Sequence, residues 1–399
     1  MDRPAFLEPG RIGPVALKNR LVRAPTSESM AETDGRANDA LKDFYGELAR
    51  GGAGLIVTGH LFVEARGQYS PRQMGIHDDA LVPGLRELVD RVHAAGGTIF
   101  AELAHAGSQS VMPDVRPVAP SAIANPMFAR EPAELDETGI EQIIAAFAAG
   151  ARRAREAGFD GIHIHGGNGY LLSEFTSPSA NRRDDSWGGD PERRGRLFEE
   201  VCRRVRDAVG PDMAVTARVG IEDSVAGGLA RPDGVALVAR LRRHGLDAVE
   251  TTLGVMSSYL QNVRPHVAVG AGRAWAAGLY PRLFAPAGAE AYYRPYARAV
   301  KEAVAIPVIL VGGLRRTETM AEAIASGDAD FIAMARPFIR EPDIAAQIAA
   351  GRRGMVDCVS CNICLYHDGR DPLRCWRRQW RSLARHAWCR FWRDRRGAD

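Results

Sequence analysis

Residues 162–170, with the sequence IHIHGGNGY, contain three side chains that could act together on one bond. An alternating apolar run that ends in a Gly-rich turn predicts a short buried strand, with His165, Asn168 and Tyr170 at its exit. His165 and Asn168 can both donate hydrogen bonds to one carbonyl oxygen and stabilise negative charge that develops there. Tyr170 is a weak acid that could deliver a proton nearby. The pattern indicates chemistry on an activated C=C or C=O bond; the alternative is a turn whose His and Asn only cap a helix.

The elements that would position these residues alternate between strand and helix. Eight segments predict strands, at residues 21–24, 55–58, 98–103, 161–165, 214–219, 248–251, 307–311 and 331–334. Helical patterns lie between them, at residues 37–50, 83–95, 138–157, 192–208, 233–244, 289–305 and 317–326. Eight strand-then-helix units predict an α/β fold in the form of a (β/α)8 TIM barrel. A doubly wound sheet is the alternative, but no GxGxxG follows the first strand.

Several segments lie outside these repeating units. A turn within residues 3–18 predicts a small hairpin that closes the bottom of the barrel. Residues 108–136 and 256–286 are long connections, which in compact domains are often functional covers. The expected division of the chain is a barrel domain at 1–355, a Cys-rich segment at 356–375 and an Arg/Trp-rich tail at 376–399.

The composition is that of a soluble globular protein with an ample core. The 399 residues are 46% hydrophobic and 25% charged, no apolar run approaches the length of a membrane span, and a secretory leader is absent. We therefore expect a cytoplasmic location. Residues 376–399 carry eight Arg and two Asp, so the rest of a chain with net charge +3 is mildly acidic. We expect a small-molecule substrate and a homo-oligomer, with neither nucleic acid nor membrane as a partner.

In a TIM barrel the active site lies where the strands end, and polar residues follow most of the predicted strands. The candidates are, in chain order, Pro25, Thr26, Ser27, His60, Glu102, Arg218, Gly312, Gly313, Ala335 and Arg336. Paired glycines let backbone N–H groups approach an anion, and an arginine adds a forked cation. The last two strand ends therefore predict a phosphate site, although Gly312-Gly313 alone could be a tight turn.

The motifs that hold these residues resemble the old yellow enzyme family of FMN-dependent oxidoreductases, including its NADH:flavin oxidoreductase and dienoyl-CoA reductase branch. The block HGGNGYLLSEFTSPSANRRDDSWGG at 165–189 is highly specific. The other matching motifs are LKNRLVRAPT at 17–26, AELAHAGSQ at 101–109, RGRLFEEV at 194–201 and VGGLRRTETMAEAIASGDADFIAMARPFIREPD at 311–343. The resemblance implies FMN at the top of the barrel and NADH or NADPH as its reductant.

The resemblance also implies how the flavin would be held. Pro25 and Thr26 would contact it through the backbone, and Arg218 would stabilise the anionic reduced flavin near N1 and O2. The residues that would hold the FMN phosphate are Gly312, Gly313, Ala335 and Arg336.

For the substrate, the resemblance implies reduction of an α,β-unsaturated carbonyl compound. His165 and Asn168 would hold the carbonyl oxygen, and Tyr170 would protonate the α-carbon. The first alternative is oxidative N-demethylation of a small amine, as in the trimethylamine dehydrogenase branch. The resemblance implies that this branch has Tyr and His at the two positions that match His165 and Asn168, which weakens the alternative. The second alternative is a non-catalytic barrel subunit that uses the tail for docking.

Three positions depart from the family pattern. Glu102 stands where Gln is usual in the family. An ionised carboxylate only accepts hydrogen bonds, whereas an amide also donates them. Glu102 therefore binds only flavin N3–H, is protonated, or turns away from the flavin. Ser27 replaces Thr, Cys, His or Tyr, and His60 stands where a small residue is common. We therefore expect a shifted flavin potential of unknown sign. For His60 and His105 the alternative is a histidine satisfied by neighbours behind the site.

Four cysteines follow the barrel with the spacing C-x2-C-x2-C-x10-C. Three close thiolates and one more distant form a ligand set for an iron–sulfur cluster of the 4Fe-4S type. The order is similar to that in the trimethylamine dehydrogenase and dienoyl-CoA reductase branches, and here a cluster would need a separate electron-transfer partner. A tetrahedral zinc site and a motif without metal are the alternatives. The expected ligands are Cys358, Cys361, Cys364 and Cys375.

The tail at 376–399 interleaves four of the six Trp with Arg. Such a segment could form a membrane-surface helix or stack on nucleic acid. We favour instead a tail that packs on the barrel or is poorly ordered.

Overall fold

The computed structural model describes residues 3–125, 128, 130–257, 262 and 290–389. Eight parallel strands close into a barrel, and the last strand pairs with the first. In order around the ring they are β3 (Leu21–Arg23), β4 (Leu55–Phe62), β5 (Ile99–Ala104), β8 (Gly161–Gly166), β9 (Ala214–Glu222), β10 (Ala248–Leu253), β11 (Val308–Leu310) and β12 (Phe331–Met334). All eight predicted strands, and with them the TIM barrel, are confirmed.

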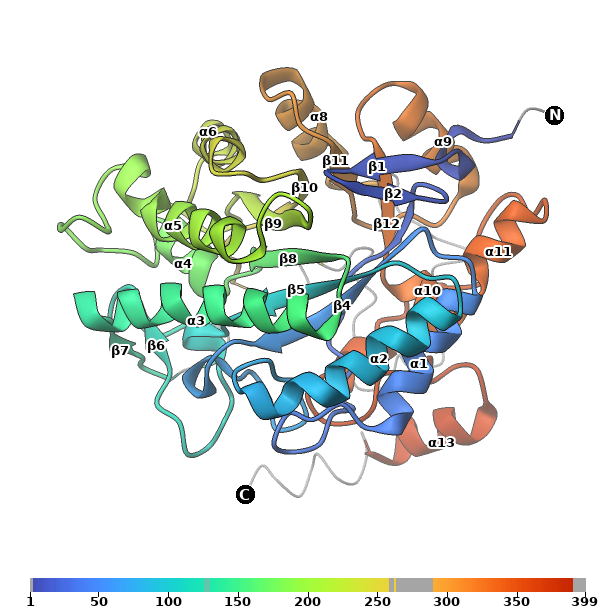
Figure 1. The fold of residues 1–399 in the computed structure, drawn as a ribbon, viewed down its shortest axis with the longest axis horizontal. Coiled ribbons are helices and arrows are strands. Elements are labelled where there is room, and N and C mark those ends of the chain that lie inside the picture. The colour runs from blue at the N-terminus through green and yellow to red at the C-terminus, as the bar shows by residue number, and fades with distance from the viewer. Residues whose placement is uncertain (1–2, 126–127, 129, 258–261, 263–289, 390–399) are drawn as a thin grey trace.

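Helices follow the strands and lie outside the barrel (Figure 1). Side chains of Asn38, Asp136 and Asp190 accept N–H bonds in the first turns of three of them, which satisfies donors that a helix leaves unpaired. The main helices are α1 (Asp39–Arg50), α2 (Val82–Ala94), α3 (Glu137–Ala157), α5 (Pro191–Val209), α6 (Arg231–Arg243), α8 (Arg294–Ala303) and α9 (Thr317–Ala325). These confirm the seven predicted helices.

Short elements occupy the connections. The short helices are α4 (Leu171–Thr176), α10 (Arg336–Arg340), α11 (Ile344–Ala349), α12 (Ile363–Tyr366) and α13 (Trp380–Trp388). The 3-10 turns are η1 (Ala5–Leu7), η2 (Ala65–Gly67), η3 (Asp79–Leu81) and η4 (Gly107–Gln109). No helix among the described residues is both long enough and apolar enough to cross a lipid bilayer.

The predicted N-terminal hairpin is present as β1 (Gly10–Ile12) and β2 (Val15–Leu17), which pair antiparallel. Ile12 and Leu17 are buried in one apolar cluster with residues from the starts of the barrel strands, such as Val22 and Phe100. The hairpin therefore closes the N-terminal end of the barrel and leaves the other end free for a site.

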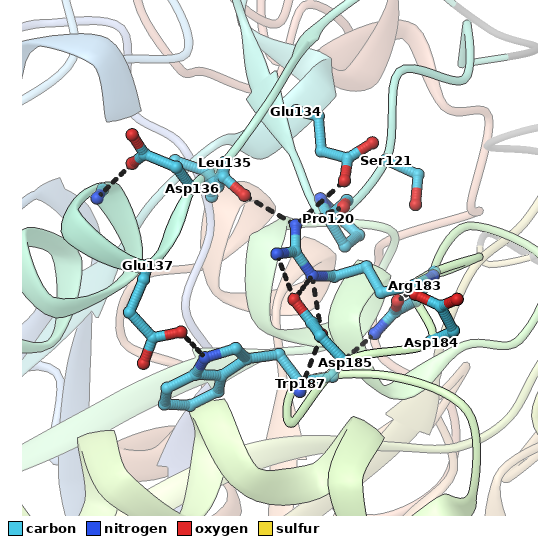
Figure 2. Close-up of polar contacts among 12 residues, drawn as sticks. Pro120, Ser121, Glu134, Leu135, Asp136, Glu137, Arg183, Asp184, Asp185 and Trp187 are labelled. Carbon is cyan, nitrogen blue, oxygen red and sulfur yellow. Dashed lines mark hydrogen bonds and ion pairs between the residues drawn. The ribbon is translucent and has the colours of Figure 1, made fainter.

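The long connection at 108–136 contains β6 (Val118–Ala119) and β7 (Ala133–Glu134) and is fixed by one arginine. Arg183 donates to the carbonyl oxygens of Pro120 at 3.0 Å and Leu135 at 2.6 Å, and Asp185 holds its other edge (Figure 2). The connection is thus tied to the 165–189 motif. The second long connection, at 256–286, lies almost entirely outside the described residues.

The segment after the barrel is joined to it at residues 369–373. Backbone N–H groups of Leu373 and Gly369 donate to the Glu28 carbonyl at 2.8 Å and to Ser29 Oγ at 3.0 Å. Trp376 is buried and stacks on His367 with ring centroids 3.6 Å apart. In Figure 1 this segment, with α13, lies at the opposite edge of the molecule from the hairpin.

Candidate active site

A cavity of about 1290 Å³, including its open mouth, lies at the C-terminal ends of the barrel strands. Side chains from strands far apart in the sequence, such as His165, Arg218 and Arg336, meet around it. The predicted catalytic and flavin-contacting residues that line it are Pro25, Thr26, Ser27, His60, Glu102, His165, Asn168, Tyr170, Arg218, Gly312, Gly313, Ala335 and Arg336. The structure therefore brings all of them together.

His105 is the one candidate histidine that does not line this cavity. Its Nε2 lies 2.9 Å from Glu64 Oε1, and its Nδ1 accepts the Gly107 backbone N–H at 3.1 Å. His105 is thus a buried histidine satisfied behind the site, which was the alternative interpretation.

His165 is held by Glu102 from the neighbouring strand. Nδ1 of His165 lies 2.9 Å from Glu102 Oε1, while its buried Nε2 has no hydrogen-bond partner. Burial raises the pKa of Glu102 and lowers the pKa of His165 well below its usual value. Both shifts favour the uncharged forms. A protonated Glu102 donates its O–H to Nδ1, and the N–H on Nε2 is then free to donate into the cavity.

Asn168 is positioned by its own backbone. It adopts a left-handed φ of 60°, which asparagine tolerates, and its N–H donates to the Leu253 carbonyl at 2.8 Å. Its side-chain oxygen accepts from Thr252 Oγ1 at 3.4 Å. In this orientation the Nδ2 amide group is left as a donor.

Tyr170 stands immediately before α4, and its ring meets His165 edge-on at a centroid distance of 4.5 Å. The phenolic oxygen lies 3.3 Å from His60 Nε2. Burial raises the pKa of Tyr170 well above its usual value. The phenol therefore keeps its proton and can act as an acid.

Arg218 is a buried cation of the candidate site, and it lies on β9 as the register partner of His165 on β8. Its Nε donates to Glu250 Oε1 at 2.6 Å, and Glu250 is fully buried. Burial lowers the pKa of Arg218, but attraction to Glu250 and Glu102 outweighs it and the net shift is upward. The guanidinium thus keeps its positive charge inside the barrel.

The predicted phosphate end is formed by the loops after β11 and β12. Gly312 and Gly313 have left-handed φ values of 114° and 74°, and a Cβ on Gly312 would come within 2.9 Å of Tyr292 and Tyr293. Only glycine fits at position 312. Arg336, at the start of α10, donates to Asn362 Oδ1 at 2.6 Å.

Arg315 is a cavity residue that sequence reasoning missed. It is only 2% exposed, and its Nε and Nη1 have no hydrogen-bond partner, although Glu290 lies 3.5 Å away as an ion-pair partner. Buried donors without acceptors are costly, so this site is built to receive an anionic group. The available signal was the Arg315-Arg316 pair, one residue after the glycines.

Asp368 is a second missed residue, and it comes from the segment after the barrel. It lines the same cavity and accepts hydrogen bonds from Ser27 and from the backbone N–H of Gly369. Its Oδ1 is buried without a partner, and burial raises its pKa to about 6. The cavity therefore carries a carboxyl group with a vacant acceptor.

The four clustered cysteines line a second, smaller cavity of about 670 Å³, again including its open mouth. Cys364 also lines the large cavity, so the two spaces are adjacent. Arg336 and Arg340 border the smaller cavity, and Arg340 Nη1 lies 4.0 Å from Cys375 Sγ. Within the described part of the chain, no three His, Cys, Asp or Glu side chains converge as a single metal ion requires.

Residues 5–354 match the family model described as the NADH:flavin oxidoreductase / NADH oxidase family. A protein named NADH oxidase from Thermoanaerobacter brockii is 35% identical over 366 residues, which are 90% of this chain and 53% of that protein. The chain thus spans about half the length of that relative. A 4,4'-dithiodibutanoate disulfide reductase from Rhodococcus erythropolis is 33% identical over 379 residues, covering 91% of this chain and 92% of the relative.

Two solved structures are similar over most of the chain. A complex titled 2-naphthoyl-CoA reductase with 2-naphthoyl-CoA has a TM-score of 0.82 at 25% identity, over 93% of this chain and 56% of that one. The histamine dehydrogenase of Rhizobium sp. 4-9 has a TM-score of 0.77 at 26% identity, over 93% of this chain and 52% of the other.

Proposed function

Because the chain belongs to the old yellow enzyme family of NADH:flavin oxidoreductases, we propose that it is an FMN-dependent enzyme that reduces the C=C bond of an α,β-unsaturated carbonyl compound with NADH or NADPH. One observation carries this proposal. Two hydrogen-bond donors, His165 and Asn168, and one acid, Tyr170, line a single cavity at the strand ends. An activated C=C bond next to a carbonyl group needs those three functions.

The residues of the cavity fit FMN. The paired glycines Gly312 and Gly313 allow backbone N–H groups to approach an anion, and the unpaired donors of Arg315 suit a phosphate. Arg218 would face the pyrimidine edge of the ring system. When bound, FMN supplies the hydride chemistry of the reaction.

The protein's own residues would activate the substrate and deliver a proton. His165, through Nε2–H, and Asn168, through Nδ2–H, would bind the carbonyl oxygen and make the β-carbon more electrophilic. Losing one such donor typically costs about 100-fold to 1000-fold in rate. Tyr170 would give its phenolic proton to the α-carbon, because burial keeps that proton on the oxygen.

The test is the double variant H165A/N168A. We expect it to retain FMN and to lose nearly all enone reduction. A matched control is H244A, which changes a histidine at the end of α6 on the outside of the barrel. Unchanged turnover in the double variant would reject the assignment.

A second candidate function is the oxidation of a small amine, and Asp368 favours it. Its vacant Oδ1 could accept a hydrogen bond from an ammonium group inside the cavity. The similarity to a protein titled histamine dehydrogenase supports the same class of substrate. Assaying enones and methylated amines on one preparation separates the two functions. D368N should abolish amine turnover only; amine turnover without enone turnover would reject the first proposal.

We also propose that Cys358, Cys361, Cys364 and Cys375 hold a 4Fe-4S cluster. Their spacing and their shared cavity support it. A cluster beside the flavin site would pass electrons to a partner protein.

Metal analysis of anaerobically purified protein tests the cluster. The cluster would be supported if C364S lost its iron while the control variant C202S kept it. Cys202 is a suitable control because it lies in α5, outside the cysteine cluster. Zinc alone, or no metal, would reject it.

A further inference from the structure

We propose that His60 sets the direction of the hydrogen bond at Tyr170, so that the phenolic proton faces the substrate. The inference rests on the proposed role of Tyr170 as proton donor. His60 is buried in β4 and lines the large cavity, and its Nε2 lies 3.3 Å from Tyr170 Oη. What has to be decided is which of these two atoms donates.

Gln73 decides it. The Gln73 side chain is buried, and its Oε1 accepts the backbone N–H of Tyr69 at 2.5 Å, which fixes the orientation of the amide. Gln73 Nε2 therefore faces His60, 2.9 Å from Nδ1 and 3.0 Å from the His60 carbonyl oxygen. An amide N–H group only donates, so Nδ1 of His60 must accept and carries no proton.

The proton of His60 is then on Nε2. Burial lowers the pKa of His60 to about 4, so the ring is neutral and has one proton to place. With Nδ1 occupied as an acceptor, Nε2–H donates to the oxygen of Tyr170. If Tyr170 donated to Nε2 instead, the single proton of His60 would be on Nδ1. That N–H would then face the N–H of Gln73 Nε2, and two donors would oppose each other.

This arrangement orients the O–H of Tyr170 and stabilises the phenolate that forms when the proton leaves. Because Tyr170 Oη accepts from His60, its own O–H turns toward the open cavity. When the O–H bond breaks and a C–H bond forms at the substrate α-carbon, the phenolate oxygen keeps the His60 hydrogen bond, which stabilises its charge. The phenolate later regains a proton from water. His60 is thus a positioning residue that acts through Tyr170 rather than a flavin contact. The other titratable groups near the pair are Tyr69, Glu102, His165, Arg218 and Asp368.

Two variants of position 60 separate this role from simple packing. In H60L the donor is lost, whereas in H60Q an amide N–H can stand near the place of Nε2. We expect H60L to slow the reoxidation of the reduced enzyme by 2-cyclohexenone at least about tenfold, because one pKa unit at the acid is a tenfold change in equilibrium. H60Q should recover most of that rate. In a Y170F background, H60L should cost nothing further.

A measurement without turnover tests the proton position directly. Nitrogen NMR of protein with labelled histidines, compared with H60Q to assign the signal, should show His60 protonated on Nε2 and bare on Nδ1. A proton on Nδ1, or an H60L effect that persists in Y170F, would overturn the inference. If Y170F itself leaves enone reduction unchanged, the proposed role of Tyr170 fails instead.

Discussion

Glu102 Oε1 lies 2.9 Å from His165 Nδ1, and both side chains are buried inside the barrel. Only one proton fits between these two atoms, so the ionisation state of Glu102 decides which nitrogen of His165 carries its N–H. A neutral Glu102 donates to Nδ1 and leaves Nε2–H facing the cavity. An ionised Glu102 accepts from Nδ1–H, and Nε2 becomes an acceptor that cannot hold a carbonyl oxygen.

Enone reduction should therefore weaken as pH rises through the raised pKa of Glu102. In that range the carboxyl group ionises and His165 loses its donor toward the substrate. We expect kcat/KM for an enone to fall on the high-pH side of the wild-type profile. E102Q should flatten that limb, because an amide N–H donates to Nδ1 at every pH. The same high-pH limb in E102Q would show that another group is responsible.

Glu174 should make the fold less stable at alkaline pH. Its carboxyl group is buried against Ser108, and burial raises its pKa from 4.5 to about 8. A group whose folded pKa is raised stabilises the fold below its unfolded pKa and loses that contribution as pH rises from about 4.5 to about 8.

E174Q should remove this dependence and raise the unfolding free energy at pH 8 by roughly 2 kcal/mol relative to the wild type. Urea unfolding at pH 5 and pH 8 measures the effect, with E192Q in the exposed first turn of α5 as the control. If E174Q and E192Q lost the same unfolding free energy between pH 5 and pH 8, the assignment would be contradicted.

Arg315 should contribute to FMN affinity through the phosphate. Its buried Nε and Nη1 lack hydrogen-bond partners, so a phosphate would supply the acceptors they need. We expect R315A to weaken FMN binding by about tenfold to 100-fold, on the scale of one charge-assisted hydrogen bond. Riboflavin, which has no phosphate, should bind both forms alike.

Fluorescence titration of the apoprotein with FMN and riboflavin measures both affinities. R316A is a close control, because Arg316 is the next residue in the chain and is exposed. A parallel loss of riboflavin affinity in R315A would mean that Arg315 supports the fold of the loop instead.

The barrel and the gathering of residues around its mouth could be predicted from sequence because both follow from local pattern. The strands are buried on both faces, so they appear as short apolar runs, and the ends of parallel strands meet at one edge. Glu102 and His165 could thus be placed near each other, on neighbouring β5 and β8. Their contact, which sets a tautomer, could not be predicted because it depends on side-chain orientation.

Residues beyond the repeating pattern were harder to place. Asp368 reaches the cavity from the segment after the barrel, whose path no strand–helix alternation specifies. Gln73 acts on His60 through the fixed orientation of its side-chain amide. That orientation is known only from the backbone N–H of Tyr69, which donates to Gln73 Oε1. His105 looked like His60 in the sequence, yet the structure satisfies it with Glu64 behind the site.

Two tryptophans of the tail should behave differently although both stand among arginines. Trp376 is 1% exposed, stacks on His367, and carries Arg374 over its ring at 4.1 Å, whereas Trp380 is 74% exposed. Replacing a buried Trp by Ala typically costs about 3–5 kcal/mol, while an exposed one costs little. W376A should therefore expose the 356–389 segment to limited proteolysis, and W380A should not. Bound FMN should remain in both variants, because the predicted flavin contacts, from Pro25 to Arg336, all lie in the barrel itself. Equal cleavage of the two variants would mean that the stacking of Trp376 does not hold the segment in place.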